Sequence, residues 1–241
     1  PDLNGVWQVL NSANYNLEAH SASAALAMIE GPVVPIPHPS VVRLGAVGAV
    51  PAGLGVVEGG TIPYKKWALK QRDNNKKNWL DNDPEIKCYL PGVPRATYMH
   101  LPFQIFHSEK AIFFAYEYAG AVRNIYLEDP GPAPVDSWMG QSWGYWEGDT
   151  FVIEASGFNG QTWLDRSGNF HSEELKVTER YTLMNPYTMN YEATIVDEKV
   201  FTRPWKISMT LYKRVGKDAQ LQQFKCVEFV EELLYGQWRG N

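Results

Sequence analysis

Residues 175–183 carry the sequence LKVTERYTL, and this stretch decides the fold class. One parity is apolar apart from Glu179, while the other consists of charged residues and threonines. A period of two residues is that of a β-strand with one buried face. Asn185-Pro186 then predicts a turn, and further strands follow at 189–197 and 204–213. Consecutive strands of this kind bury their apolar faces against each other, which predicts an antiparallel sheet.

Upstream segments extend the β pattern towards the N-terminus. Strands are predicted at 5–10, 112–118, 122–127 and 151–155, the last of them directly after the tight-turn sequence Glu147-Gly148-Asp149. A barrel or a highly curved sheet buries one face of every strand and leaves few exposed edges. We therefore expect a mainly β fold.

The remaining segments predict helices and a long loop around the sheet. A helix is expected at 17–29, which is rich in alanine and lacks glycine and proline, and an exposed helix at 65–79. Residues 31–63 contain six prolines and many glycines, and they predict a long ordered loop or lid. A closing helix is expected at 227–235. The whole chain, 1–241, is interpreted as a single domain.

Charge and hydropathy exclude two classes of partner. The 241 residues contain 22 Lys and Arg against 27 Asp and Glu, a net charge of −5, and no long basic run is present to bind nucleic acid. The most apolar stretch, 44–57, is interrupted by glycines and is too short to span a bilayer. Its Gly, Ala and Val composition suits a contact between copies in a homo-oligomer.

Aromatic residues are abundant, with nine Trp, thirteen Tyr and ten Phe. Such rings favour strands and can line a cavity, although ordinary core packing uses them too. A small aromatic or apolar molecule is therefore the partner that we expect. The five histidines show no metal-ligand spacing and the chain has no nucleotide-binding motif, so no metal and no cofactor are expected.

Glu179 is the first candidate functional residue, because strand parity directs its carboxylate among apolar side chains. Burial raises the pKa of a carboxyl group unless a cation pairs with it. Arg123, on an otherwise apolar strand, and Arg95 are the candidate cations. A buried pair of this kind can be architectural or catalytic, and the sequence leaves both roles open.

The polar loop at 163–174 supplies two more candidates. His171 can exchange a proton near neutral pH, and Asp165 or Glu179 can orient or assist it. The alternative role for His171 is a surface hydrogen bond or a cap. Arg123 completes the predicted catalytic set by holding an oxyanion or a carboxylate. The residues predicted to bind the substrate are Tyr116, Tyr118, Trp143, Trp163 and Arg95.

A G-x-S-x-G motif at 140–144 is followed by Asp149, Asp165 and His171, which is the order of catalytic residues in α/β-hydrolases. A nucleophile elbow needs a strand, a sharp turn and a helix, whereas Ser142 is followed by turn residues without a helical period. We therefore expect Ser142 to be a hydroxyl within the sheet.

Cys88 and Cys226 are too few for a zinc cage and too far apart for a C-x-x-C redox pair. On spacing alone, one long-range disulfide and two free thiols are equally acceptable. A disulfide requires an oxidising compartment. The chain opens at Pro1 without a leader pattern, so either it acts in the cytosol or a leader has been removed.

Several longer motifs form a recognisable set. They are DPE at 83–85, CYLPGVPR at 88–95, W-x-G-x-S-x-G-x-WEGDT at 138–150, His171-Ser172, Glu179-Arg180 and FTRPW at 201–205. From residue 83 to residue 235 the chain resembles a large family of exported bacterial proteins of unknown function. The Gly5-x-Trp7 start is similar to that of lipocalin-like (calycin-type) barrels. The resemblance implies a Cys88–Cys226 disulfide and a periplasmic or secreted location after removal of a signal peptide.

These patterns predict an antiparallel lipocalin-like barrel, or a highly curved sheet, with a few peripheral helices and a long N-terminal loop region. The expected function is that of an exported, cofactor-independent enzyme doing general acid–base chemistry of the lyase, hydratase or isomerase type in a barrel cavity. The alternatives are a protein that binds a small hydrophobic ligand without converting it, and an assembly protein that buries 44–57 against a partner.

Overall fold

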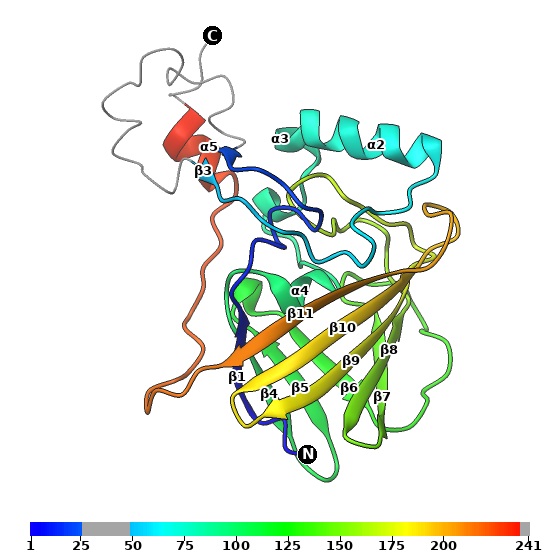
Figure 1. The fold of residues 1–241 in the computed structure, drawn as a ribbon, viewed down its shortest axis with the longest axis vertical. Helices are drawn as coiled ribbons and strands as arrows, with labels where there is room; N and C mark the ends of the chain where they lie inside the picture. The colour runs from blue at the N-terminus through cyan, green and yellow to red at the C-terminus, as the bar shows by residue number, and fades with distance from the viewer. Residues whose placement is uncertain (26–48, 237–241) are drawn as a thin grey trace.

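The computed structural model describes residues 1–25 and 49–236, and within them nine strands close into a barrel (Figure 1). Going round the barrel, the strands follow the order β1-β11-β10-β9-β8-β7-β6-β5-β4. The mainly β, barrel-forming fold class is thereby confirmed. The strands are β1 Gly5–Val9, β4 Phe103–His107, β5 Ile112–Tyr116, β6 Val122–Tyr126, β7 Gln141–Glu147, β8 Thr150–Ser156, β9 Lys176–Asn185, β10 Thr188–Val196 and β11 Trp205–Lys213.

Neighbouring strands of the barrel are antiparallel, with one exception. β6 and β7 run parallel and pair only at Ile125 with Ser142 and at Tyr126 with Trp143. The connection 127–140 is long enough to return the chain to the end of the barrel from which β6 started. The expectation of consecutive antiparallel strands is wrong at this point, because the direction of a strand depends on its connection and not on its own side chains.

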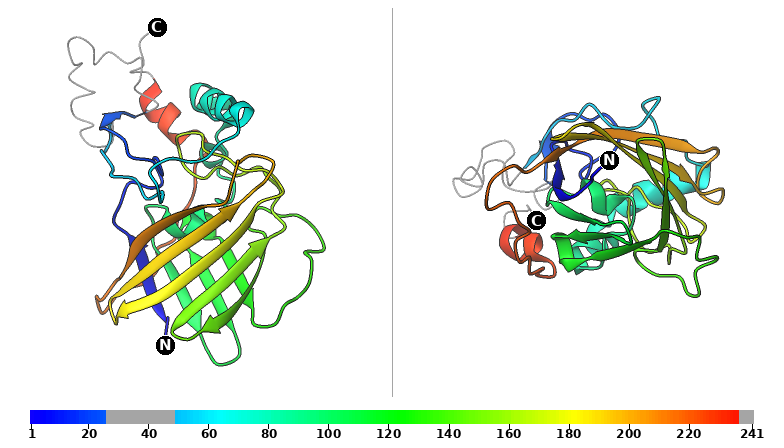
Figure 2. Two further views of the ribbon diagram at one scale, coloured as in Figure 1. Left: turned by 45° about the vertical axis from the view of Figure 1, so that its right-hand side comes forward. Right: turned by 90° about the horizontal axis from the view of Figure 1, so that it is seen from below.

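The helices and a small second sheet gather at one end of the barrel, opposite the N-terminus (Figures 1 and 2). We call this end of the barrel the mouth. The chain also forms two short 3-10 turns, η3 at Glu85–Lys87 and η4 at Tyr118–Gly120. The other elements are α2 Lys66–Lys77, α3 Trp79–Asn82, α4 Arg95–Tyr98, α5 Val230–Tyr235, β2 Ser23–Ala24 and β3 Ala49–Val50.

The helix expected at 17–29 is absent from 17–25, and its last four residues lie outside the described part of the chain. The backbone N–H groups of this segment bond to distant acceptors instead. The N–H of Leu17 donates to Asp165 Oδ2 at 2.8 Å, and that of His20 donates to the carbonyl of Gly53 at 2.9 Å. Tertiary hydrogen bonds therefore override the helix propensity of the alanines.

Two other expected segments are partly described. The loop expected at 31–63 and the apolar stretch at 44–57 are described only from residue 49 onward. There, Val57 forms an isolated bridge with Ile207 of β11, while Leu54 is 98 % exposed. The exposed helix expected at 65–79 corresponds to α2 and the start of α3, although α2 buries Ala68 and Asn75.

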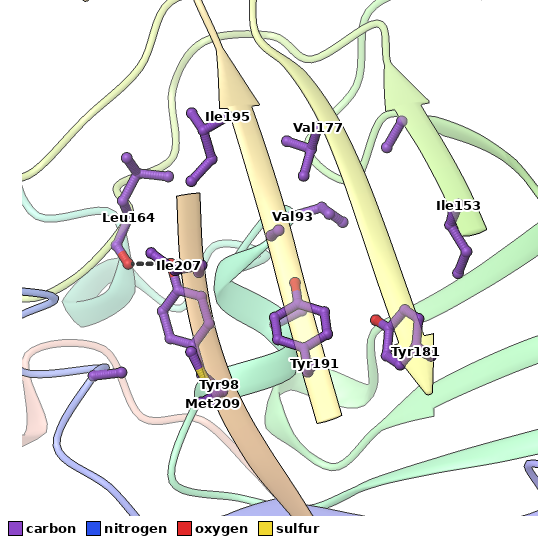
Figure 3. Packing of buried hydrophobic residues seen from close by; sticks show 14 of the residues in the cluster. Val93, Tyr98, Ile153, Leu164, Val177, Tyr181, Tyr191, Ile195, Ile207 and Met209 are labelled. Atoms are coloured by element: carbon purple, nitrogen blue, oxygen red, sulfur yellow. Dashed lines mark hydrogen bonds between the residues drawn. The ribbon is translucent and has the colours of Figure 1, made fainter. Parts of the chain in front are cut away.

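Side chains from all around the wall fill the barrel interior. Figure 3 shows those on the side formed by β8 to β11. The rings of Phe114 on β5 and Tyr181 on β9 pack edge to face with their centroids 5.6 Å apart, although three strands separate β5 from β9 in the sheet. Trp7 is fully buried, and its Nε1 donates to the carbonyl of Leu3 at 3.0 Å. At the level of these rings, side chains from opposite walls meet across the barrel.

Candidate functional site

A buried ion pair crosses the barrel interior from β6 to β9. Arg123 and Glu179 are 3 % and 0 % exposed, and Arg123 Nη2 lies 2.5 Å from Glu179 Oε2. Glu179 Oε1 accepts hydrogen bonds from the hydroxyls of Tyr181 at 2.9 Å and Tyr191 at 2.8 Å. Arg123 Nε donates to Ser142 Oγ at 2.7 Å. Parity alone placed Glu179 correctly in the interior, and Arg123, not Arg95, is its cation.

The Arg123 guanidinium of this pair stays charged across the physiological range. Burial lowers the pKa of Arg123, but the carboxylate of Glu179 more than offsets this, and the net pKa is raised. Burial and the charge of Glu179 raise the pKa of Tyr181 and of Tyr191 well above the usual value. Burial also raises the pKa of Tyr116 to about 12. Arg123 and the three tyrosines therefore keep their protons near neutral pH, and the cluster joins strands across the barrel.

His171 is buried, and both of its ring nitrogens are bonded. Nδ1 lies 2.8 Å from the carbonyl oxygen of Ser172, which can only accept, so Nδ1 carries the proton. Nε2 then accepts from Thr162 Oγ1 at 2.6 Å. Burial lowers the pKa of His171, so its imidazole is neutral. The sequence placed His171 in a polar loop, and the structure shows it holding that loop together.

Asp165 anchors the N-terminal segment to the same loop. It is fully buried and accepts from the N–H groups of Leu17 and Ser167, each at 2.8 Å, and from Asn169 Nδ2 at 2.6 Å. Burial raises its pKa to about 6. The donors occupy both carboxylate oxygens, and His171 contacts other residues.

The remaining predicted residues lie in separate places. Trp143 packs on Tyr145 with ring centroids 5.0 Å apart, and Trp163 packs with Trp79 in a second small apolar cluster. Tyr118 donates its hydroxyl to the carbonyl of Glu85 at 3.1 Å. Ser142 lies within β7 as a sheet hydroxyl, as expected. The structure thus joins Arg123, Glu179 and Tyr116 in one cluster, and it places His171, Asp165 and the other predicted residues elsewhere.

A second ion network, which the sequence did not reveal, lies at the mouth. Glu85 on η3 binds Arg95 on α4 and also binds Arg166 bidentately, through Arg166 Nε at 2.9 Å and Nη2 at 2.8 Å. Burial raises the pKa of Glu85, but Arg166 and Arg95 lower it to about 2. Burial raises the pKa of neighbouring Asp83 to about 7. The two neighbouring carboxyl groups, Asp83 and Glu85, therefore have very different pKa values.

Replacing Asp83 with asparagine tests this environment. The carboxyl of Asp83 has a higher pKa in the folded chain than its usual 3.8, so the folded state binds this proton more tightly and the free energy of unfolding falls as pH rises from about 4 to 7. Asp83→Asn keeps the acceptor for the Glu85 N–H, at 2.8 Å, and removes the titration. We expect the variant to match the wild type at pH 4 and to be more stable by on the order of 4 kcal/mol at pH 8.

Urea unfolding at both pH values measures this difference. The free energy of unfolding of the variant should still fall with rising pH, but less steeply, because the pKa of Asp165 is also raised, to about 6. A variant that is less stable than the wild type at pH 8 contradicts the assignment.

A cavity of about 710 Å³ opens beside this network, at the mouth. Ligand pockets usually have volumes of roughly 300–1,000 Å³. Its apolar part comes from small residues such as Ala24, Ala49 and Val50. Its polar walls include the side chains of Tyr15, His20, Lys76, His100, Arg166 and Glu231.

The two histidines of the cavity differ in what their rings can do. Both ring nitrogens of His20 face carbonyl oxygens, those of Glu18 at 2.8 Å and Pro51 at 3.0 Å, so this ring offers no free acceptor. His100 is exposed towards the cavity and has no hydrogen-bond partner among residues 1–25 and 49–236. The surrounding protein and the charge of Arg166 lower its pKa below 6.5. At neutral pH His100 is therefore an uncharged base.

A C-terminal strap, residues 214–229, leads to α5, whose Glu231 lines the cavity. It runs from the end of β11 along the barrel to α5 (Figure 1). The Cys88–Cys226 disulfide fixes it, which confirms the predicted pairing, and the N–H of Phe229 donates to the carbonyl of Ile86 at 2.7 Å. On α5, Glu231 Oε1 lies 3.1 Å from Arg166 Nη1.

In the described part of the chain, no group of three or more His, Cys, Asp or Glu side chains is arranged to hold a metal ion. None of the helices found there is both long enough and apolar enough to cross a membrane.

The fold and the mouth cavity define a closed β-barrel with a polar-walled pocket beside an arginine network. No family model, curated protein or solved structure matches this chain. The resemblance to exported bacterial proteins therefore stays a prediction.

Proposed function

We propose that the protein is an exported, cofactor-independent enzyme that binds a small organic molecule in the mouth cavity and transfers a proton on it. The observation that carries this proposal is His100. An imidazole that is uncharged at neutral pH and bonded to no described residue stands in a cavity large enough for a substrate. A base of this kind suits reactions that remove a proton from carbon or activate water, as in lyases, isomerases and hydratases.

The other cavity residues fit the same role. Arg166, held in place by Glu85, offers positive charge beside His100 and can stabilise negative charge that develops on the substrate. Val50 and the neighbouring alanines can accept the apolar part of the molecule. His171 is not proposed for the reaction, because Thr162 and Ser172 occupy both of its nitrogens. The disulfide supports an oxidising, extracytoplasmic location.

His100→Gln tests the proposal. Small molecules that co-purify with the protein are identified by mass spectrometry, and their conversion by wild type and variant is followed. We expect the variant to lose about 10²- to 10⁴-fold in kcat/KM, the usual contribution of a general base. Wild-type kcat/KM falls as the pH drops below the pKa of His100, which lies under 6.5, because protonation removes the base.

The matched control is His171→Gln, a histidine replaced outside the cavity. It is expected to lower stability and to leave the pH profile unchanged. Full activity in His100→Gln, with an unchanged pH profile, removes the basis of the enzymatic proposal.

Ligand binding without conversion is the second candidate. The guanidinium of Arg166 is paired with both Glu85 and Glu231, so this arginine can serve to build the wall without taking part in a reaction. This pairing favours the second candidate. Retention of co-purified molecules without turnover by the wild type supports this candidate.

A further inference from the structure

The guanidinium of Arg166 has two kinds of partner. Its Nε and Nη2 face the two oxygens of Glu85, whose side chain is 7 % exposed and also binds Arg95. Its Nη1 faces Glu231, whose side chain is 33 % exposed and lines the cavity. The first pairing is buried in the protein wall, whereas the second lies at the surface of the cavity. Glu231 is therefore the partner that a molecule in the cavity can replace.

The charges around this arginine require a second anion. Glu85 provides one negative charge between two guanidinium groups, those of Arg95 and Arg166. Asp83, the neighbouring carboxyl, has a pKa of about 7 and is only partly ionised at neutral pH. The charge of Glu231 thus completes the balance on the cavity side. Among the described residues that line the cavity, Glu231 is the one carboxylate, while Lys76 adds a further positive charge.

The position of Glu231 is set by α5, which follows the tethered strap. α5 is six residues long and follows the strap, which the disulfide holds to η3 and its neighbours at Cys88. The contacts that dock the strap below α5 are those of Phe229 with Ile86, of Phe224 with the ring of Tyr118, and of Gln222 with Glu117. Because these contacts precede α5, Glu231 can leave Arg166 without release of the strap.

We propose that the mouth cavity takes a small organic carboxylate whose charge replaces that of Glu231 on Arg166 Nη1, and that Glu231 is a built-in competitor for this position. This proposal rests on the proposed function for the identity of the cavity, and it names the ligand class that the cavity accepts. The disulfide-tethered strap keeps Glu231 near Arg166, so that Glu231 binds Arg166 again when the ligand leaves. Binding of the anion and displacement of Glu231 are then two sides of one equilibrium.

Binding measurements with matched probes test this competition. The probes are acetate, benzoate and 2-naphthoate, each compared with its neutral amide, titrated at low ionic strength into wild type, Glu231→Gln and Glu228→Gln. Glu228→Gln removes the same charge from the exposed part of the strap and is the matched control. We expect at least one carboxylate to bind more tightly than its amide and to gain about tenfold in affinity in Glu231→Gln. Glu228→Gln should behave as the wild type.

Two results overturn the proposal. One is that no carboxylate binds more tightly than its amide in any of the three proteins. The other is that Glu231→Gln improves the binding of amides as much as that of carboxylates, which shows that the substitution only opened space. As a second readout, saturating carboxylate should increase hydrogen exchange at 230–235 of the wild type, and unchanged exchange also counts against displacement of Glu231.

These measurements need no turnover, so they separate the two proposals. Failure of the anion preference, together with loss of activity in His100→Gln, overturns only the ligand class. An anion preference found together with full activity in His100→Gln overturns only the catalytic role.

Discussion

Arg123→Met is expected to reduce the free energy of unfolding by about 3–5 kcal/mol, the usual cost of removing one partner from a buried ion pair. The substitution leaves the carboxylate of Glu179 inside the barrel with only the hydroxyls of Tyr181 and Tyr191 as donors. Methionine retains most of the packing volume of arginine, so the loss reports chiefly on charge. Unfolding in guanidinium chloride, followed by tryptophan fluorescence, measures this loss of stability.

The double variant Arg123→Met/Glu179→Gln is the control for this prediction. Removing the second charge leaves a neutral amide that still accepts from both tyrosines, so most of the lost stability should return. A double-mutant cycle gives the coupling between the two residues. A single variant that loses less than about 1 kcal/mol shows that the interior tolerates an unpaired carboxylate, which is the outcome that the complete burial of Glu179 argues against.

Cys88→Ser/Cys226→Ser is expected to cost about 5 kcal/mol, because the disulfide closes a loop with a sequence separation of 138 residues and so restricts the unfolded chain. The native contacts of the strap survive the substitution in part, so the folded barrel should keep its strand content. Thermal unfolding with and without a dithiol reductant measures the effect.

Reductant should lower the Tm of the wild type towards that of the double serine variant and leave the variant itself unchanged. An equal Tm for oxidised wild type and variant would mean that the unfolded chain is already restricted in another way. Circular dichroism before heating distinguishes this outcome from a variant that never folded.

The alternation of side chains was enough to predict much of the barrel. In β9 and β11 the inward-facing residues follow a period of two, which is a property of each strand by itself. The parallel pairing of β6 with β7 could not be found in this way, because it depends on the path of the connection 127–140. The helix expected at 17–29 failed for a related reason, since the competing hydrogen-bond acceptors on Asp165 and Gly53 are distant in sequence.

The candidate sites show the same division. Glu179 was conspicuous because one carboxylate interrupted an apolar parity, and its environment is the one that parity predicts. The mouth cavity had no such signal, because His100, Arg166 and Glu231 come from three segments that only the folded chain brings together. A single loop histidine, His171, attracted attention by its residue type alone, and its two hydrogen bonds show why residue type does not identify a base.

The first barrel strand also bears on how the protein is made. β1 lies between β4 and β11, pairing Trp7 with Phe103 on one side and with Lys213 on the other. The ring of strands therefore cannot close until almost the whole polypeptide has left the ribosome, and contacts of such long sequence separation form slowly. Until then the side of β1 that pairs with β11 has no partner, and such an open edge can associate with other chains.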